Sequence, residues 1–307
     1  VRAFQSGEIH AIHNLPPAIT HSLSREPGVR IFTSIAPRYS AILFNQSDTG
    51  SPAIRTKEVR QAIAYALDRE SLVDNALDGQ GIVFEGPYLP ENWAARPDLM
   101  TNYSHQLEAA GALLDAAGWT GPGVRLREGQ PLSLRLAIID QPEQRAIAEG
   151  IAGQLADVGF DIQIYPLSSI DSLLETLSTR DFDLALVEIA PDNDPDLYDF
   201  WSQEATVRGQ NYGGWNNRRA SEALESGRQI FSQGERAPYY EAFLRHFDSD
   251  LPALTLYQHT TTYVLSEGVR QAEVGRVWLP RDRYRTLPQW FINYRDVSVS
   301  CPQGNPN

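Results

Sequence analysis

Two patterns of hydrophobic and polar residues, one typical of strands and one typical of helices, follow each other in turn through the middle of the chain. Apolar residues at every second position predict strands at residues 132–138, 160–164 and 182–189. Between them, apolar residues spaced by three and four predict amphipathic helices at residues 147–158 and 168–177. The order strand, helix, strand, helix, strand favours right-handed crossovers. The pattern therefore predicts an α/β fold with a mostly parallel sheet flanked by helices.

Similar patterns predict further elements on both sides of this series. They are strands at residues 29–35 and 39–45, helices at 59–67, 68–77 and 104–117, helices at 220–231 and 238–247, and strands at 254–257 and 261–265. Asp68 and Ser168 stand where a side chain can cap the start of a helix, and Pro238 stands where a first helical turn tolerates proline.

The loop after residues 182–189 is unusually acidic. The strand stops at Pro191, and Asp192, Asp194 and Asp196 then occupy every second position. In open α/β sheets, ligands bind beyond the carboxyl ends of the strands. We therefore expect this loop to form half of a ligand site.

The aromatic residues beside this loop allow two interpretations. They can pack the following helix, because aromatic side chains bury large areas, or they can line a pocket in which rings stack on a ligand. Their position next to the acidic loop favours the pocket for Trp201, Tyr212 and Trp215. The complete set of candidate ligand-binding residues is Asp192, Asn193, Asp194, Trp201, Asn211, Tyr212 and Trp215.

Composition narrows the class of partner. The chain has 307 residues, of which 42% are hydrophobic and 21% charged, as expected of one large globular domain or two modest ones. The formal net charge of −13 and the lack of a basic cluster argue against nucleic acid and anionic membranes as partners, because both require a positive surface. A cationic or zwitterionic ligand is easier to accommodate.

No motif supports a catalytic, metal or cofactor site. The three loop aspartates match the first ligand positions of a calcium loop, but Leu197 and Gln203 stand where that loop needs glycine and glutamate. Cys301 is the only cysteine, which excludes a disulfide framework and a cysteine metal site. Nucleophile-elbow, phosphate-loop and zinc-protease motifs are absent from the sequence. We predict that the protein is not an enzyme and uses no cofactor or metal.

A set of short motifs, spread along nearly the whole chain, carries a family resemblance. The motifs are Val59-Arg-Gln-Ala-Ile-Ala-Tyr-Ala-Leu-Asp-Arg-Glu70, Gly86-Pro87, Ala116-Ala-Gly-Trp119, Phe182-Asp-Leu-Ala185, Asp194-Pro-Asp196, Asn211-Tyr212 and Leu254-x-Leu-Tyr257. In this order they resemble the C-terminal part of the extracellular solute-binding proteins of family 5. Together the motifs are highly specific. Members of that family serve ABC importers of dipeptides, oligopeptides, nickel and some oligosaccharides.

The resemblance implies a fold and a location. The fold is a lobe of the type II periplasmic-binding-protein-like class. Residues 42–282 would form the C-terminal ligand-binding lobe, and residues 1–41 and 283–307 would be remnant strands of a missing N-terminal domain. Full-length members carry a long further segment before the position of Val1, so we expect a fragment. The protein would be extracytoplasmic, in the periplasm or as a cell-surface lipoprotein, with its signal segment outside this chain.

The resemblance also implies a function. The chain would be the C-terminal lobe of the substrate-binding component of an ABC importer, which captures a peptide-like solute, a small molecule or an oligopeptide, and delivers it to the membrane permease. In peptide-binding members an aspartate after a Gly-Trp strand pairs with the α-ammonium of the ligand. That position falls on Asp192 when counted from Phe182-Asp183, and on Pro191 when counted back from Asp194-Pro195.

Two alternatives stay open. Glu188-Ile189 replaces the Gly-Trp of the peptide binders, and aromatic platforms also serve sugars, so an oligosaccharide is the alternative ligand. An α/β hydrolase is the alternative of another class, because fold does not fix function. A serine, cysteine or histidine beside a base in the cleft would favour the hydrolase, since binding alone needs none.

Missing partner strands would leave unpaired edges in a fragment of this kind. Residues 29–35 and 290–294 would expose backbone groups and apolar side chains such as Phe32, Trp290 and Phe291. We therefore expect a dimer through these exposed edges.

Overall fold

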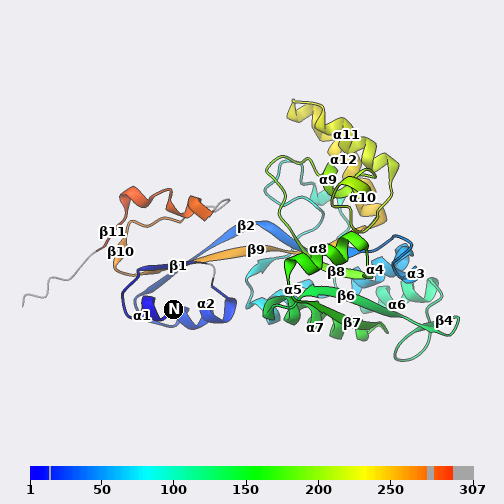
Figure 1. Ribbon diagram of the computed structural model, residues 1–307, viewed down its shortest axis with the longest axis horizontal. Helices are drawn as coiled ribbons and strands as arrows, with labels where there is room; N and C mark the ends of the chain where they lie inside the picture. Colours follow the sequence, from blue (N-terminus) through cyan, green and yellow to red (C-terminus); the bar gives the residue numbers. More distant parts are fainter. Residues whose placement is uncertain (14, 275–279, 293–307) are drawn as a thin grey trace, which may run out of the picture. The chain divides into compact units, whose positions relative to one another are not determined.

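The computed structural model describes residues 1–13, 15–274 and 280–292 (Figure 1). The chain divides into two compact units. The smaller unit comprises Val1–Ile35 and Thr261–Asn307, and the larger unit comprises Ala36–Thr260. The assignment of residues 42–282 to one lobe of a longer protein stays a prediction.

The main sheet has the strand order β1-β9-β2-β8-β6-β7. In the larger unit, β6 (Ser133–Ile139) pairs in parallel with β7 (Asp161–Leu167) and with β8 (Leu184–Ile189). β2 (Val29–Phe44) pairs antiparallel with β8, and β3 (Gly81–Ile82) pairs antiparallel with β9 (Ala253–Ser266). The predicted α/β class is confirmed, but the sheet is mixed rather than mostly parallel. Its parallel part consists of the predicted strand and helix series, whereas β2 and β3 pair antiparallel with their neighbours.

Helices cover both faces of this sheet. One face packs against α3 (Pro52–Arg55), α4 (Lys57–Ala66), α5 (Arg69–Leu77), α6 (Leu107–Ala116) and α7 (Pro142–Ala156). The other face packs against α8 (Ile170–Thr179), α9 (Tyr198–Trp201), α11 (Arg218–Arg228) and α12 (Gln233–Asp250). The short α10 (Ala205–Arg208) follows α9, the 3-10 turn η1 (Pro97–Leu99) precedes α6, and a small hairpin joins β4 (Leu126–Arg127) to β5 (Gln130–Pro131).

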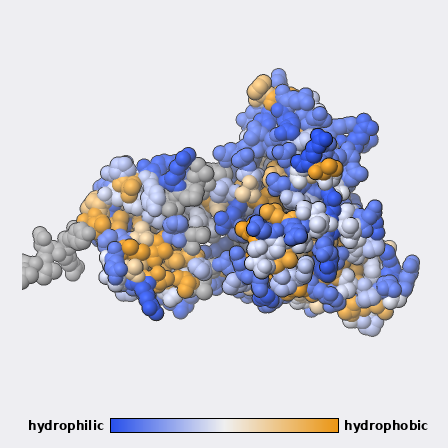
Figure 2. Space-filling model, in the orientation of Figure 1, coloured by the Kyte–Doolittle hydropathy of each residue, from blue (hydrophilic) through white to orange (hydrophobic). Residues whose placement is uncertain are grey.

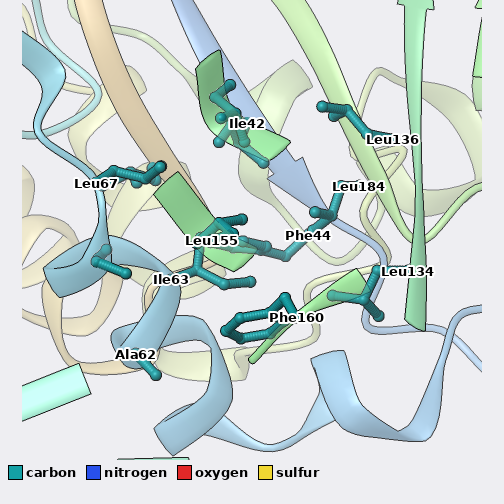
Figure 3. Close-up of a cluster of buried hydrophobic side chains, with 14 of the residues drawn as sticks. Ile42, Phe44, Ala62, Ile63, Leu67, Leu134, Leu136, Leu155, Phe160 and Leu184 are labelled. Atoms are coloured by element: carbon teal, nitrogen blue, oxygen red, sulfur yellow. The ribbon is translucent and has the colours of Figure 1, made fainter. Parts of the chain in front are cut away.

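Each face of the sheet has its own hydrophobic core, and adjacent residues of one strand contribute to different cores. Ile42 and Phe44 of β2 pack toward the α4 and α7 side, as Figure 3 shows, whereas Ala41 and Leu43 belong to the cluster on the α8 and α12 side. Side chains on a strand alternate between its two faces, so a strand covered on both faces is apolar at nearly every position. This explains why β8 is almost continuously hydrophobic.

β2 and β9 are each one long strand, where the sequence predicted two short ones. Pro37 interrupts the pattern in β2, but pairing with β8 begins only at Tyr39, so the missing N–H costs no bond to that strand. In β9 the polar Gln258 and His259 stay inside the strand because both have partners. Gln258 donates to the carbonyl of Ala36 at 3.1 Å.

Local signals at helix starts were confirmed in one case and wrong in two. Asp68 caps α5 by accepting from the backbone N–H of Ser71 at 2.9 Å. The cap of α8 is Ser169, one residue after the predicted Ser168. Pro238 lies inside α12, which begins at Gln233. The proline is tolerated there because the carbonyl that loses its partner, four residues earlier at Gly234, is on exposed backbone near the helix start.

The smaller unit is built from short elements around two apolar clusters. They are α1 (Arg2–Gln5), β1 (Ala11–His13), α2 (Pro17–Ser24), the 3-10 turns η2 (Pro280–Tyr284) and η3 (Leu287–Gln289), and the pair β10 (Val269–Arg270) with β11 (Phe291–Ile292). β1 pairs antiparallel with the second half of β9. Cys301 and residues 293–294 of the predicted edge lie outside the described residues.

Arg60 joins three helices of the larger unit through a buried guanidinium group. Its side chain donates to the carbonyls of Ile54 at 2.7 Å and Arg55 at 3.0 Å, at the end of α3. It also donates to the carbonyls of Asp250 at 2.5 Å and Leu251 at 3.0 Å, at the end of α12. The carbonyls at a helix end have no partner within the helix, so one cation satisfies two helix ends from α4.

We expect Arg60→Leu to lower the free energy of unfolding by about 3 kcal/mol, because it leaves these buried carbonyls unpaired. The matched control is Arg55→Leu, which removes an exposed pair with Asp48 and should cost less than about 1 kcal/mol. Urea denaturation of both variants measures the difference. A loss below about 1 kcal/mol for Arg60→Leu would contradict this role.

Candidate functional site

A pocket of about 520 Å³ lies at the carboxyl ends of β6 and β8 in the larger unit. Its apolar lining consists of Leu43, Ile139, Ile170, Leu173, Leu174, Leu177, Val187, Ile189, Ala190, Phe200, Trp201 and Tyr212. Its polar lining consists of Gln141, Gln144, Glu188 and Gln210. A pocket at the ends of parallel strands is where an open α/β sheet binds ligands, and the acidic loop predicted this end of the sheet.

Helix α8 forms the apolar wall of the pocket. Only part of the apolar surface of this helix is buried in the core. Leu173 and Leu177 are buried in the core, whereas Ile170 and Leu174 remain 62% and 45% exposed. Residues four apart lie on one face of a helix, so Ile170 and Leu174 form an apolar pair at the pocket. Figure 2 shows hydrophobic residues gathered on the surface where Figure 1 places α8.

The acidic loop is fixed to α12 by a bidentate ion pair. Both carboxylate oxygens of Asp194 accept from Arg236, at 2.7 and 2.6 Å. The Arg236 guanidinium also lies over the rings of Tyr240, at 5.1 Å, and Trp93, at 5.8 Å. The hydrogen bonds from Arg236 hold the pKa of Asp194 below its usual value.

A second ion pair fixes the loop to α11. Asp196 pairs with Arg228 at 2.9 Å and accepts from the backbone N–H of Tyr198, the first residue of α9, at 3.1 Å. The hydroxyl of Tyr88 donates to the carbonyl of Pro195 at 2.9 Å. The side chain of Asn92 donates to the carbonyl of Asn193 at 3.2 Å. The segment that carries Tyr88 and Asn92 therefore holds the loop backbone as well.

Asp192 differs from the other two aspartates of the loop. Its carboxylate is exposed and has no hydrogen bond or ion pair with any residue in the described ranges. Asn193 is also exposed, and its contact to Asn92 uses only its backbone carbonyl. Asp194 and Asp196 are committed to arginines, so Asp192 is the loop carboxylate that remains available to a ligand.

The structure separates the predicted aromatic residues. Trp201 is buried, lines the pocket and packs edge-on against Phe247 at 5.0 Å between ring centroids. Tyr212 is half-buried and also lines the pocket. Trp215 is buried behind Trp201, does not line the pocket, and donates its indole N–H to Asp250 at 2.9 Å.

Asn211 uses its whole amide group to hold its own loop. Its nitrogen donates to the carbonyls of Ser202 at 2.9 Å and Trp215 at 2.8 Å, and its oxygen accepts from the backbone N–H of Trp215 at 3.0 Å. The side chain is 2% exposed and does not line the pocket. Asn211 therefore shapes the loop that carries Tyr212 rather than facing the pocket itself.

Sequence reasoning missed the contributions of α7, α8 and the segment before Asn211. Gln141, Ile170, Leu174 and Gln210 all line the pocket. The sequence of α8 did contain a usable signal. Ile170 and Leu174 widen the apolar face of this helix beyond the part that packs in the core. The glutamines carried no such signal, because isolated polar residues at loop and helix starts are common.

A serine and a histidine lie side by side, but not in the pocket. Ser40 of β2 and His259 of β9 are 2.8 Å apart between the hydroxyl oxygen and Nε2. Ser40 is only 3% exposed, so its hydroxyl is not accessible to a substrate. Burial, followed by the nearby charge of Arg38, lowers the pKa of His259 to about 3, and the ring is neutral near pH 7. The pair satisfies polar groups between strands and gives the hydrolase alternative no accessible nucleophile.

Within the described ranges, no group of three or more histidine, cysteine, aspartate and glutamate side chains could hold a metal ion. None of the helices in those ranges is long and apolar enough to span a membrane.

Comparison with known proteins gives a consistent result. Residues 1–211 match the family described as bacterial extracellular solute-binding proteins, family 5 Middle. The chain is 25% identical over 299 residues to the oligopeptide-binding protein AppA of Bacillus subtilis, covering 95% of this chain and 53% of AppA. It is 28% identical over 170 residues to the nickel-binding periplasmic protein of Escherichia coli, covering 53% of this chain and 32% of that protein.

Solved structures show the same fold. AppA of Bacillus subtilis in complex with a nonapeptide superposes with a TM-score of 0.79 at 24% identity, over 95% of this chain and 58% of AppA. NikZ of Campylobacter jejuni in complex with Ni(L-His) gives a TM-score of 0.76 at 21% identity, over 94% of this chain and 58% of NikZ. The chain spans about half the length of the curated relative AppA.

We expect Asp194→Asn to lower the free energy of unfolding by about 1 kcal/mol at pH 7, because its partly exposed ion pair with Arg236 is lost. The pKa of Asp194 is lower in the folded state than in the unfolded state. The pair therefore stabilises the fold above the unfolded pKa of about 4, and its contribution disappears as the pH falls through the folded pKa. Denaturation at several pH values measures this.

The matched control is Asp192→Asn in the same loop, which should leave stability unchanged at every pH because Asp192 has no partner in the described ranges. An Asp194→Asn effect that is the same at pH 7 and at pH 3 would show that the ion pair is not the cause.

Proposed function

Because the chain belongs to the bacterial extracellular solute-binding proteins of family 5, we propose that it forms the C-terminal lobe of the substrate-binding component of an ABC importer. The lobe binds a peptide-like solute, and the importer's permease receives that solute at the membrane. The family consists of solute-binding proteins rather than enzymes. The protein works outside the cytoplasm, in the periplasm or at the cell surface.

One observation carries this proposal: a firmly held loop presents a free carboxylate beside an apolar pocket. Ala190 lines the pocket, and Asp192 follows two residues later. The Cα atoms of residues two apart are separated by at most about 7 Å. An ammonium group at Asp192 and a side chain in the pocket therefore fit within one short peptide, whose residues advance by about 3.3 Å each when extended.

The relatives support a peptide over the other ligands of the family. The Bacillus subtilis relative is named for binding oligopeptides, and its solved structure holds a nonapeptide. An oligosaccharide remains the alternative, since Phe200, Trp201 and Tyr212 give the pocket aromatic surface.

We expect Asp192→Asn to weaken the binding of a free-amine tripeptide at least about tenfold, which corresponds to about 1.4 kcal/mol. An exposed ion pair is worth about 0–1 kcal/mol, and removing one partner of a desolvated charge pair costs about 2–5 kcal/mol, so the value expected for a pair that the peptide partly covers lies between these limits. The N-acetylated tripeptide has no ammonium group and should bind both proteins alike. Ligand-detected NMR suits this measurement, because a single lobe should bind no tighter than about 1 mM.

Asp199→Asn is the control, since Asp199 is an exposed aspartate on α9 that does not line the pocket. If Asp192→Asn affects the free and the acetylated peptide equally, the ammonium role is wrong. Binding of a neutral oligosaccharide that does not depend on Asp192 would then make the sugar the better assignment.

We propose that the chain also forms a dimer through the smaller unit. Phe291 and Ile292 of β11 are 50% and 38% exposed, although Trp290 packs against the cluster around Tyr263 and Leu265. Exposed apolar strands favour pairing with another chain. Phe291→Ser should therefore shift the protein toward monomer in sedimentation velocity at high concentration. Phe231→Ser, at a fully exposed phenylalanine of the larger unit, should not. A wild-type monomer at all concentrations would contradict the dimer.

A further inference from the structure

The pocket beside the acidic loop has almost no charge in its lining. Glu188 is the one acidic residue in the lining. Its carboxylate pairs with Arg38 at 3.3 Å, so its charge is compensated within the protein. A cationic ligand group would compete with Arg38 for Glu188.

An anionic group is also unsuited to this pocket. No lysine, arginine or histidine belongs to its lining. Moving a carboxylate from water into such a pocket removes its hydration without supplying a counter-ion, which is costly. The polar lining consists of the neutral amides of Gln141, Gln144 and Gln210 beside Glu188. Amide groups hydrogen-bond neutral partners such as peptide groups.

The apolar lining supplies the favourable part of binding. Ile170 and Leu174 are exposed in the free protein, so covering them removes apolar surface from water on both partners. The volume of about 520 Å³ lies within the range of about 300–1,000 Å³ that small-molecule pockets occupy. The pocket can therefore hold a large aliphatic or aromatic side chain.

We infer that this pocket receives an uncharged, apolar side chain from one of the first three residues of the solute peptide. The inference rests on the proposed function, in which Asp192 binds the α-ammonium group. Ala190 lines the pocket at most about 7 Å along the chain from Asp192, and a peptide covers that distance in two to three residues. The pocket thus determines which peptides are preferred, while Asp192 fixes where the peptide begins.

Tripeptides that carry one leucine, at position 1, 2 or 3 of a glycine background, test this inference on the 307-residue chain. At one position, leucine should bind at least about tenfold more tightly than serine at the same position, as burial of a leucine side chain implies. Glutamate and lysine at that position should give no gain over serine. Ligand-detected NMR measures the dissociation constants.

Leu174→Asp places a charge in the pocket at a partly exposed helix position and should abolish the preference for leucine. Val207→Asp is the matched control, because Val207 is 81% exposed on α10 and does not line the pocket. It should keep the preference. Circular dichroism of both variants confirms that they fold.

Fluorobenzene, followed by fluorine NMR, probes the pocket without any peptide. Loss of its binding in Leu174→Asp and retention in Val207→Asp support the apolar site even if no peptide binds, in which case the proposed function fails by itself. Tripeptides that bind through their free amine but show no leucine preference would overturn the inference and leave the proposed function standing. Fluorobenzene binding that survives Leu174→Asp would also overturn it.

Discussion

Burial of the central strands on both faces is the constraint on which the larger unit depends. Because helices cover both sides of β2, β6 and β8, these strands must be apolar on both sides and must pair all their backbone groups. Most of the polar chemistry therefore lies at the strand ends, and Ser40 inside β2 is satisfied by His259. At one end Asp183 accepts from the backbone N–H groups of Ser51 and Arg135, each at 2.8 Å. At the other end lie Glu188, the pocket and the acidic loop.

The sequence was most informative where local pattern and burial agree. The alternating strands and the helices between them predicted the parallel part of the sheet, since both patterns reflect which side faces the core. The sequence was less informative about whether two short strands form one continuous strand. Pro37 and the pair Gln258 and His259 resemble interruptions, and only the neighbouring strands show that these residues are accommodated within β2 and β9. Partners distant in sequence decide such cases, and local pattern does not contain them.

The same limit applies to the site. The acidic loop could be placed at the strand end from sequence, but the partners that hold two of its three aspartates could not be identified. Arg228 and Arg236, more than thirty residues further on, commit two of them and leave Asp192. Likewise, helical spacing marked Leu173 and Leu174 as apolar without showing that the first is buried in the core, whereas the second stays 45% exposed at the pocket. Asn211 and Trp215 were chosen for their chemistry, and that chemistry is used within the protein.

The attachment of the loop to α11 and α12 has a consequence for protein engineering and for divergence within the family. Asp194 and Asp196 pair with arginines from two helices that are distant in sequence. The loop and these two helices therefore form one structural unit whose residues must change together. A loop transplanted from a relative with different aspartate spacing would remove the carboxylates that pair with Arg228 and Arg236 and would lose its own attachment to these helices. Exchange of ligand specificity between relatives should therefore succeed when residues 190–240 move together, and natural recombination would be expected to respect the same block.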